Sequence, residues 1–332
     1  MDKRVAILGS GSWATALAKI VMLNQEHINW YMRKQLAINE FQATGKNPGY
    51  LTNAKFDTSR ITFSANINNV IKASDILILA IPSPYVLQTL NKIRTKLTGK
   101  TIISAVKGMI PNENVLVTDY LHDKFGVPMD KLAIIAGPCH AEEIALERLS
   151  YLTIGCSDAA YAKELGQLFD TDFVRTTPST DVDGLEYSSV MKNIYAIAAG
   201  LCHSLRYGDN FQAVLISNAI QEIQRFADAL GKQEDRDINA SGYLGDVLVT
   251  CYSKFSRNRQ FGQMIGMGYS VKAAQMEMEM VAEGYYGTQA IHLLNERVHC
   301  NLPIVDAIYD ILFNHHSPTI VVKQLTQQLQ ES

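Results

Sequence analysis

The stretch VAILGSGSWATALAKIVML, residues 5–23, decides the fold class of this chain. Its first four residues are a continuous apolar run, which is typical of a strand covered on both faces. Gly9, Gly11 and Ala14 follow at the spacing of a dinucleotide-binding fingerprint, and residues 13–23 have a helical apolar pattern. Strand, glycine-rich turn and helix in succession predict the first unit of a nucleotide-binding α/β domain, although an ordinary glycine-rich turn has the same local pattern.

Further apolar runs of strand length alternate with helical patterns through the first half of the chain. After residues 5–8, the expected strands are Ile28–Tyr31, Ile76–Ile81, Thr101–Val106, Leu132–Ala136 and Phe173–Thr177. Several of these runs are continuously apolar, which favours strands with helices on both sides. The sequence therefore predicts an α/β fold with a Rossmann-type, doubly wound parallel sheet.

The periodicity changes near residue 180. Residues 178–184 are rich in Pro, Thr, Asp and Gly, and the patterns beyond them are long and helical, as in Tyr187–Leu201 and Phe211–Leu230. We therefore predict a dinucleotide-binding Rossmann domain at residues 1–180 and an all-α substrate-binding domain at residues 181–332.

The composition favours an enzyme that acts on small molecules. The 332 residues carry 30 basic and 33 acidic side chains, a net charge of −3, with no block of like charges that would favour nucleic acid. No apolar run has the length of a membrane span, and we expect no signal peptide. The five cysteines are scattered, as is typical of reduced thiols in a cytosol. We expect a cytoplasmic protein that forms a homodimer.

The end of the second expected strand bears on the choice of cofactor. A carboxylate there grips the adenosine ribose of NAD in many Rossmann domains, but here Met32, Arg33 and Lys34 follow the strand. Arg33 is suited to pair with the 2′-phosphate of NADP, or it is an ordinary solvated charge at a strand end. The sequence thus leaves both NAD and NADP open.

Two further strand ends carry candidate ligand-binding residues. Lys107 stands at the edge where open α/β sheets bind ligands, so it is either an anion-binding group or a surface lysine. The turn at residues 137–140 precedes a helix and offers backbone amides to a ligand. Nucleophilic or metal chemistry at Cys139 or His140 is disfavoured, because no second ligand or base lies at a diagnostic spacing.

The candidate acid and base is a lysine in the second half of the chain. Lys192 lies in the apolar helical stretch Tyr187–Leu201, where desolvation would lower the pKa of its amine toward neutrality. The alternative is a lysine whose stem packs while its ammonium reaches solvent. Asp246 is either a helix cap or a carboxylate that holds a lysine or a substrate hydroxyl. The stretch Ser256-Arg257-Asn258 offers donors to a phosphate, or is an ordinary polar turn.

Assembled, these segments resemble the bacterial NAD(P)-dependent glycerol-3-phosphate dehydrogenase family over nearly the whole chain. The shared motifs occur in the family's order and are GSGSW at 9–13, VKG at 106–108, GP at 137–138, KNIYAIAAG at 192–200, GD at 245–246, SRNR at 256–259 and VAEG at 281–284. The resemblance implies a Rossmann domain followed by an all-α domain of the 6-phosphogluconate dehydrogenase type. It also implies reversible hydride transfer between NAD(P)H and dihydroxyacetone phosphate, giving glycerol-3-phosphate for glycerophospholipid synthesis.

The same resemblance implies roles for individual residues. Lys192 would be the catalytic proton donor and acceptor. The residues implied in substrate binding are Lys107, Gly137, Cys139, Lys192, Asp246, Ser256, Arg257 and Asn258. The residues implied in cofactor binding include the two glycines of the turn. The full set is Gly9, Gly11, Ser12, Trp13, Arg33, Lys107, Ala141, Arg257, Val281 and Glu283. No metal is implied.

Some positions depart from the family's pattern. Cys139 stands where Ser or Thr is usual and His140 where Phe is usual, which puts a hydroxyl contact there in question. Ala14 replaces a glycine, a change that the fingerprint tolerates. The family's Arg-Gly pair near the middle of the second domain is absent at residues 217–219, so no role is carried over to them.

Two other functions compete with this interpretation. One is a related two-domain dehydrogenase that acts on a hydroxy acid, since this pairing of domains serves several substrates. The phosphate-directed residues 256–258 argue against it. The other is a catalytically silent nucleotide-binding regulator, and the presence of both Lys192 and Asp246 argues against that.

Overall fold

The computed structural model describes residues 3–230, 236–278 and 280–329. The chain forms two compact units, one made of residues 1–106 and 117–182 and the other of residues 107–116 and 183–332. The short segment that begins at Lys107 thus groups with the second unit rather than with the strand before it. None of the helices in the described part of the chain has the length and apolar character needed to cross a membrane. The proposed domain limits at residue 180 stay a prediction.

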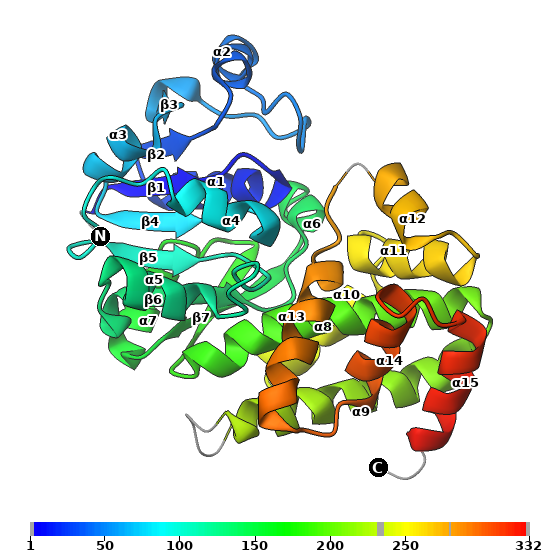
Figure 1. Ribbon diagram of the computed structural model, residues 1–332. Helices are drawn as coiled ribbons and strands as arrows, with labels where there is room; N and C mark the ends of the chain where they lie inside the picture. The colour runs from blue at the N-terminus through cyan, green and yellow to red at the C-terminus, as the bar shows by residue number, and fades with distance from the viewer. Residues whose placement is uncertain (1–2, 231–235, 279, 330–332) are drawn as a thin grey trace. The chain divides into compact units, whose positions relative to one another are not determined.

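Unit 1 is built on one eight-stranded sheet (Figure 1). Its strands are β1 (Val5–Leu8), β2 (Ile28–Tyr31), β3 (Ile61–Ser64), β4 (Ile76–Leu79), β5 (Thr101–Ser104), β6 (Leu132–Ala136), β7 (Ser150–Cys156) and β8 (Val174–Ser179). They lie in the order β3-β2-β1-β4-β5-β6-β7-β8, and every neighbouring pair is parallel except β6 and β7. The expected doubly wound sheet is confirmed.

The helices of unit 1 connect these strands. They are α1 (Ser12–Asn24), α2 (Gln35–Thr44), α3 (Ile67–Lys72), α4 (Ser83–Leu90), α5 (Val117–Phe125), α6 (Ala141–Ala145) and α7 (Ala159–Gly166). The strand order reverses between β1 and β4, and right-handed connections therefore place α1 and α4 on opposite faces of the sheet. The carboxyl ends of β1 and β4 form the switch point at which open α/β sheets bind ligands.

Two strands are absent from the sequence prediction. In β3 only Ile61 is buried, so this edge strand lacks the continuous apolar run that marked the central strands. In β7 serine and threonine interrupt the apolar residues, and the strand reverses direction. The last strand, β8, extends beyond its predicted end and includes Pro178, which an edge strand tolerates because one side of its backbone has no ladder to complete.

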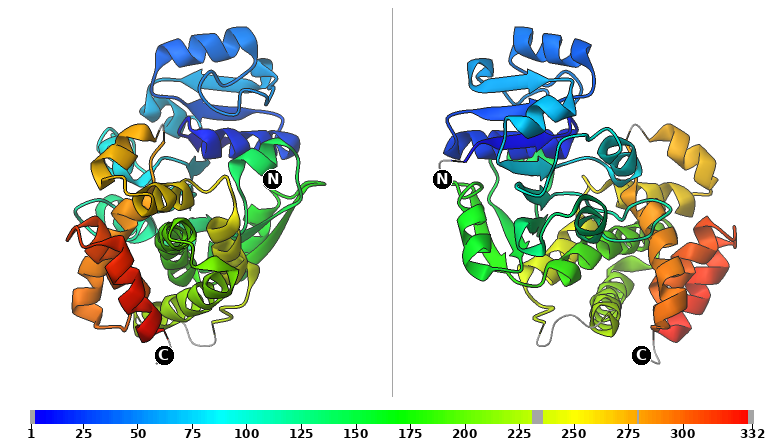
Figure 2. Two further views of the ribbon diagram at one scale, coloured as in Figure 1. Left: turned by 90° about the vertical axis from the view of Figure 1, so that its right-hand side faces the viewer. Right: turned by 60° about the vertical axis from the view of Figure 1, so that its left-hand side comes forward.

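Unit 2 is helical in the part that the structure describes. Its helices are α8 (Val182–Ser204), α9 (Gly208–Ala229), α10 (Asp246–Tyr252), α11 (Arg257–Gly266), α12 (Val271–Glu277), α13 (Glu283–Val298), α14 (Pro303–Leu312) and α15 (Pro318–Gln328), with a π-helical turn at Ser241–Gly245. Helices α13, α14 and α15 lie side by side (Figure 2). Every residue of α8 from Gly184 to Cys202 is buried, so this helix is the core of the unit.

Glycines let other helices approach α8 closely. A Cβ added to Gly262 of α11 would overlap the carbonyl oxygen of Ile197, and one added to Gly200 would overlap that of Arg259. On α13, a Cβ added to Gly284 would also be too close to the carbonyl oxygen of Asn193. The backbones of α8, α11 and α13 therefore touch where ordinary side chains would hold them apart.

We expect Gly262→Ala to lower the free energy of unfolding by about 2 kcal/mol, because overlap with a backbone carbonyl forces helix α11 away from α8. Alanine would otherwise favour the helix, so a loss identifies packing as the cause. Urea denaturation followed by circular dichroism measures the change. The control is Gly99→Ala, an exposed position whose added Cβ has no atom within 4 Å and whose stability should not change. Equal stability of both variants would contradict the prediction.

A buried carboxylate connects three helices of unit 2. Glu222 of α9 accepts hydrogen bonds from the Tyr195 hydroxyl at 3.2 Å and from the backbone N–H of Ile304 at 2.6 Å. The second donor belongs to the first turn of α14, where a helix has backbone N–H groups without partners of its own. Burial raises the pKa of Glu222 from 4.5 to about 8.

This shift predicts a pH dependence of stability. The unfolded chain releases the Glu222 proton near pH 4.5 and the folded protein holds it to about pH 8, so the free energy of unfolding falls as pH rises between these values. Relative to Glu222→Gln, the natural protein should lose on the order of 3 kcal/mol between pH 5 and pH 8. Urea denaturation at both pH values measures the difference. An exposed carboxyl variant, Glu40→Gln, should keep the natural profile, and parallel profiles for E222Q and the natural protein would refute the prediction.

Candidate functional site

The glycine turn of unit 1 lies at the switch point of the sheet. Gly9 follows β1 with a φ of +134°, a backbone conformation that residues other than glycine rarely adopt. A Cβ at this position would overlap the backbone carbonyl of Ala80, which follows β4. The Trp30 indole donates a hydrogen bond to the Gly9 carbonyl at 2.7 Å and fixes the turn from the other side. Glycine at residue 9 is therefore required by the fold itself.

The second glycine has a different environment. Gly11 is the N-cap residue of α1, and a Cβ added to it would meet no atom within 4 Å. The first turn of α1, which starts with Ser12 and Trp13, contains no acidic side chain. Open space beside the backbone N–H groups of a helix N-terminus suits an anion such as a pyrophosphate. These residues fit the dinucleotide for which the fingerprint is named.

Asn47 supports this turn and was not predicted from the sequence. Its buried amide donates to the Ser10 carbonyl at 3.0 Å and to the Thr15 hydroxyl at 2.7 Å, and it accepts from the Gly49 N–H. It therefore ties the loop after α2 to both sides of the glycine turn. A single asparagine in a polar loop gives no sequence signal for such a contact.

The other predicted sites of unit 1 lie at strand ends. Arg33 is exposed just after β2, and no carboxylate lies at residues 32–34. Gly137 follows β6 with a φ of +106°, and its Cβ would come 2.8 Å from the Tyr151 carbonyl. Cys139 is buried in the hydrophobic core, where its thiol donates to the Gly137 carbonyl at 2.9 Å. Ala141 is the first residue of the short helix α6.

In unit 2, Lys192 forms a buried ion pair with Asp246. The Lys192 amine on α8 donates to the Asp246 carboxylate on α10, and each side chain is only 2 % exposed. The amine therefore does not extend to solvent. Asp246 is also not the helix cap, since Gly245 occupies that position. The Asp246 carboxylate stabilises a positive charge on the amine, which burial alone would destabilise.

A chain of amide hydrogen bonds joins four segments beside this pair. The Asn193 amide donates to the Lys107 carbonyl at 3.0 Å and accepts from the Asn258 amide at 2.8 Å. Asn258 in turn accepts from the Gly284 N–H at 2.8 Å. The segment of Lys107, helix α8, the start of α11 and the start of α13 are thereby held together. Asn193, which follows the lysine directly, received no role from the sequence.

The remaining predicted residues of unit 2 lie at helix starts. The Ser256 hydroxyl caps α11 by accepting from the Arg259 N–H at 3.3 Å, and Arg257 is the first residue of that helix. Val281 and Glu283 lie at the beginning of α13, beside the glycine that binds Asn258. The polar-turn interpretation thus accounts for Ser256 and Asn258 in part, because both make structural hydrogen bonds. The structure brings Lys107 and residues 192, 246, 256–258, 281 and 283 into one unit.

A thiol lies near the ion pair without the character of a nucleophile. Cys251 follows Asp246 on α10 and is buried. Burial raises its pKa to about 12, and the opposing influence of Arg259 and Lys192 is smaller. The thiol is neutral at physiological pH, so Cys251 is not a candidate nucleophile. Among the described residues no group of three or more His, Cys, Asp or Glu side chains is placed to hold a metal ion.

Comparison with known proteins identifies the family. The model of the NAD-dependent glycerol-3-phosphate dehydrogenase N-terminus matches residues 4–162, and the model of the C-terminus of the same enzymes matches residues 181–323. The chain belongs to the NAD-dependent glycerol-3-phosphate dehydrogenase family.

Individual members of the family match along almost their whole length. The glycerol-3-phosphate dehydrogenase [NAD(P)+] of Clostridium botulinum is 31% identical over 97% of this chain and 96% of its own. The enzyme of the same name from an Exiguobacterium species is 32% identical over 98% of this chain and 96% of its own. The crystal structure of glycerol-3-phosphate dehydrogenase from Coxiella burnetii superposes with a TM-score of 0.88 at 26% identity, covering 98% of each chain.

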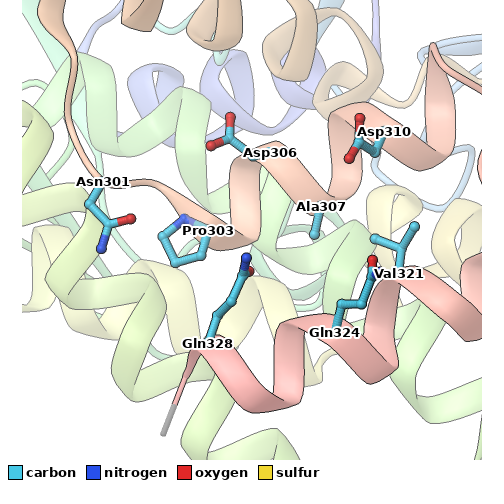
Figure 3. Close-up of a pocket in the computed structure, with 8 residues that line it drawn as sticks. All are labelled: Asn301, Pro303, Asp306, Ala307, Asp310, Val321, Gln324 and Gln328. Atoms are coloured by element: carbon cyan, nitrogen blue, oxygen red, sulfur yellow. The ribbon is translucent and has the colours of Figure 1, made fainter. Parts of the chain in front are cut away.

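A pocket in unit 2 lies apart from the residues that match the family's motifs. It has a volume of about 370 Å³, and its lining includes Asp306 and Asp310 of α14 and Gln324 and Gln328 of α15 (Figure 3). Among the residues that the structure describes, the lining includes two carboxylates and no lysine or arginine. A phosphorylated substrate would be repelled there, so this pocket is not a candidate for the substrate of the family.

We expect Asn258→Ala to destabilise the protein by about 2 to 4 kcal/mol, because it leaves the Gly284 N–H and the side-chain amide oxygen of Asn193 buried without their hydrogen bonds. Urea denaturation measures the loss. Asn314→Ala removes an exposed amide that donates to Asp310, and this control should change stability by less than about 0.5 kcal/mol. If N258A were as stable as N314A, the hydrogen bonds of Asn258 would not contribute to the free energy of unfolding.

Proposed function

We propose that this protein is an NAD(P)-dependent glycerol-3-phosphate dehydrogenase that reduces dihydroxyacetone phosphate reversibly, with Lys192 as general acid and base. The observation that carries the proposal is the buried ion pair of Lys192 and Asp246 within a chain that belongs to this family. A buried ion pair costs desolvation, and replacing it by apolar residues is often neutral or stabilising. Stability therefore gives little reason for a charged pair here, whereas proton transfer needs one.

Lys192 and Asp246 have different roles in the proposed proton transfer. Ammonium Lys192 donates a proton to the carbonyl oxygen of the substrate, and in the reverse direction the neutral amine takes the proton from the alcohol. Asp246 fixes the position of the amine and supports its charge. Bound NAD(P)H supplies the hydride that the carbonyl carbon receives, and it leaves as NAD(P)+. One hydride and one proton convert the ketone to a secondary alcohol, so the reaction is balanced.

Substrate binding is assigned mainly to cations and donors of unit 2. Arg257 and the hydroxyl and amide of Ser256 and Asn258 are proposed to bind the phosphate, with Lys107 contributing a further positive charge. Binding energy at the phosphate would orient the carbonyl toward the Lys192 amine. Gly137 and Cys139 are proposed as additional substrate contacts, although the thiol already donates to a backbone carbonyl.

Cofactor binding is assigned mainly to the glycine turn of unit 1. Gly9, Gly11, Ser12 and Trp13 are proposed to receive the pyrophosphate, which agrees with the open space at Gly11. The other proposed cofactor residues are Arg33, Lys107, Ala141, Arg257, Val281 and Glu283. Arg33 is exposed and able to meet a 2′-phosphate, so NADP is proposed beside NAD.

Further features of the proposal concern the setting of the reaction. We propose a homodimer in the cytoplasm whose product serves glycerophospholipid synthesis, with a Rossmann domain at residues 1–180 and a substrate-binding domain at residues 181–332. Sedimentation analysis tests the dimer, and limited proteolysis followed by mass spectrometry tests the domain limits.

The direct test is oxidation of NADH and of NADPH, followed by absorbance, with dihydroxyacetone phosphate or an unphosphorylated keto acid as acceptor. The proposal requires turnover with the phosphorylated ketone and at least one cofactor. Turnover with the keto acid alone would favour the hydroxy-acid dehydrogenase interpretation. Cofactor binding without turnover of either acceptor would favour a silent regulator.

We expect Lys192→Ala to lower kcat by at least about 100-fold, because it removes the proton donor, while the affinity for NAD(P)H stays nearly unchanged. Steady-state assays measure kcat, and titration followed by NAD(P)H fluorescence measures the affinity for the cofactor. Lys272→Ala, an exposed lysine of α12, is the control and should keep full activity. K192A also leaves Asp246 buried without its cation, so the double variant K192A/D246N checks that the loss does not come from misfolding. Near-normal turnover in K192A would defeat the assignment.

A further inference from the structure

Two serine hydroxyls on α8 are buried without a hydrogen-bond partner. Ser188 is 0 % exposed and Ser189 is 3 % exposed. Within residues 3–230, 236–278 and 280–329 neither hydroxyl oxygen has a partner. Buried polar atoms are nearly always paired in folded proteins, and each exception calls for a partner such as a water or a ligand. The two serines lie three and four residues before Lys192, about one helical turn away.

The geometry of the helix separates the two positions. At about 100° per residue, Ser189 lies roughly 60° from Lys192 on the side of Asn193, and Ser188 lies roughly 40° away on the side of Tyr195. Tyr195 bonds the buried carboxylate of Glu222, so the Ser188 side faces the protein interior. Asn193 bonds the Lys107 carbonyl, so the Ser189 side faces the residues proposed to bind substrate.

The hydrogen bonds of the Asn193 amide locate Ser189 relative to the segment of Lys107. It donates to the Ser189 carbonyl at 3.1 Å and to the Lys107 carbonyl at 3.0 Å, and it thereby joins this turn of α8 to the segment of Lys107. The Ser189 hydroxyl thus lies on the helix face shared by Lys192 and Asn193. A neutral donor and acceptor is available there, beside the amine proposed for proton transfer.

The proposed substrate has one polar group to which no residue has yet been assigned. Its phosphate is assigned to Arg257 and neighbouring donors, and its carbonyl oxygen to Lys192. The remaining group is the free hydroxyl on the other side of the carbonyl carbon. A hydroxyl donates one hydrogen bond and accepts others, so a serine hydroxyl is a matched and uncharged partner for it.

Resting on the proposed function, we propose that the Ser189 hydroxyl hydrogen-bonds the free hydroxyl of the phosphorylated ketone and so selects a hydroxymethyl over a methyl group at that end. Ser189 is then a specificity-determining residue. It does not take part in the proton transfer, and its contact fixes the end of the substrate that the phosphate does not hold.

The test compares Ser189→Ala with the natural protein on two substrates, dihydroxyacetone phosphate and the analogue in which the hydroxymethyl group is a methyl (acetonyl phosphate). We expect S189A to lower kcat/KM for dihydroxyacetone phosphate about tenfold, as for a lost hydrogen bond, and to change kcat/KM for the methyl analogue by less than about twofold. The variant-to-natural ratio for each substrate cancels the different reactivity of the two ketones.

Ser188→Ala is the matched control, because it also removes a buried hydroxyl without a partner. It should affect both substrates equally, and circular dichroism should show that both variants fold. Equal losses on the two substrates in S189A, no loss at all, or a selective loss in S188A instead would each overturn the proposal. If the natural protein turned over neither ketone, the proposed function itself would be wrong. That outcome is distinct from the others, because it is seen without any substitution.

Discussion

The pair of Lys192 and Asp246 is the interaction on which the proposed function of unit 2 depends. Both charges are withdrawn from water, so each is tolerable only while the other stays in place. This condition requires α8 and α10 to keep a fixed spacing. The long buried helix α8 is held in place by the close approach of α11 and α13 to its backbone. Asn193, which follows Lys192, then acquires defined hydrogen-bond partners on other segments. The candidate site is therefore a property of the packing of unit 2 as well as of its sequence motifs.

Much of unit 1 could be predicted from sequence because its central strands are buried on both faces. Such strands show apolar runs of strand length, which are continuous in β1, β4 and β6, and these three strands were predicted together with β2 and β5, whose runs include a polar residue. The edge strand β3 and the reversed strand β7 have mixed composition, so the same signal is missing. In unit 2 the sequence indicated the helices and the lysine. It did not indicate how α8 would be contacted, because that depends on residues far apart in the chain.

The candidate site shows the same limit. The family's motifs led to Lys192, Asp246 and Asn258, and the structure brings Asp246 to the lysine. Asn193 and Asn47 went unassigned, because each acts by bonding backbone groups from other segments. An asparagine has no sequence pattern that indicates a partner thirty or more residues away. The counter-charge of Lys192 likewise lies on α10, a helix that sequence spacing alone could not place beside α8.

The glycine contacts of α8 also govern its longitudinal register. Where Gly200 and Gly262 bring two backbones together, the helices meet at positions without side chains. A slip of α8 by one residue, about 1.5 Å along its axis, would push a larger residue into that crossing. The helix is therefore locked against sliding as well as against separation. The Lys192 amine, eight residues earlier on the same helix, is therefore also fixed along the helix axis. Its position depends on Gly200 and Gly262, two residues that have no reactive side chain.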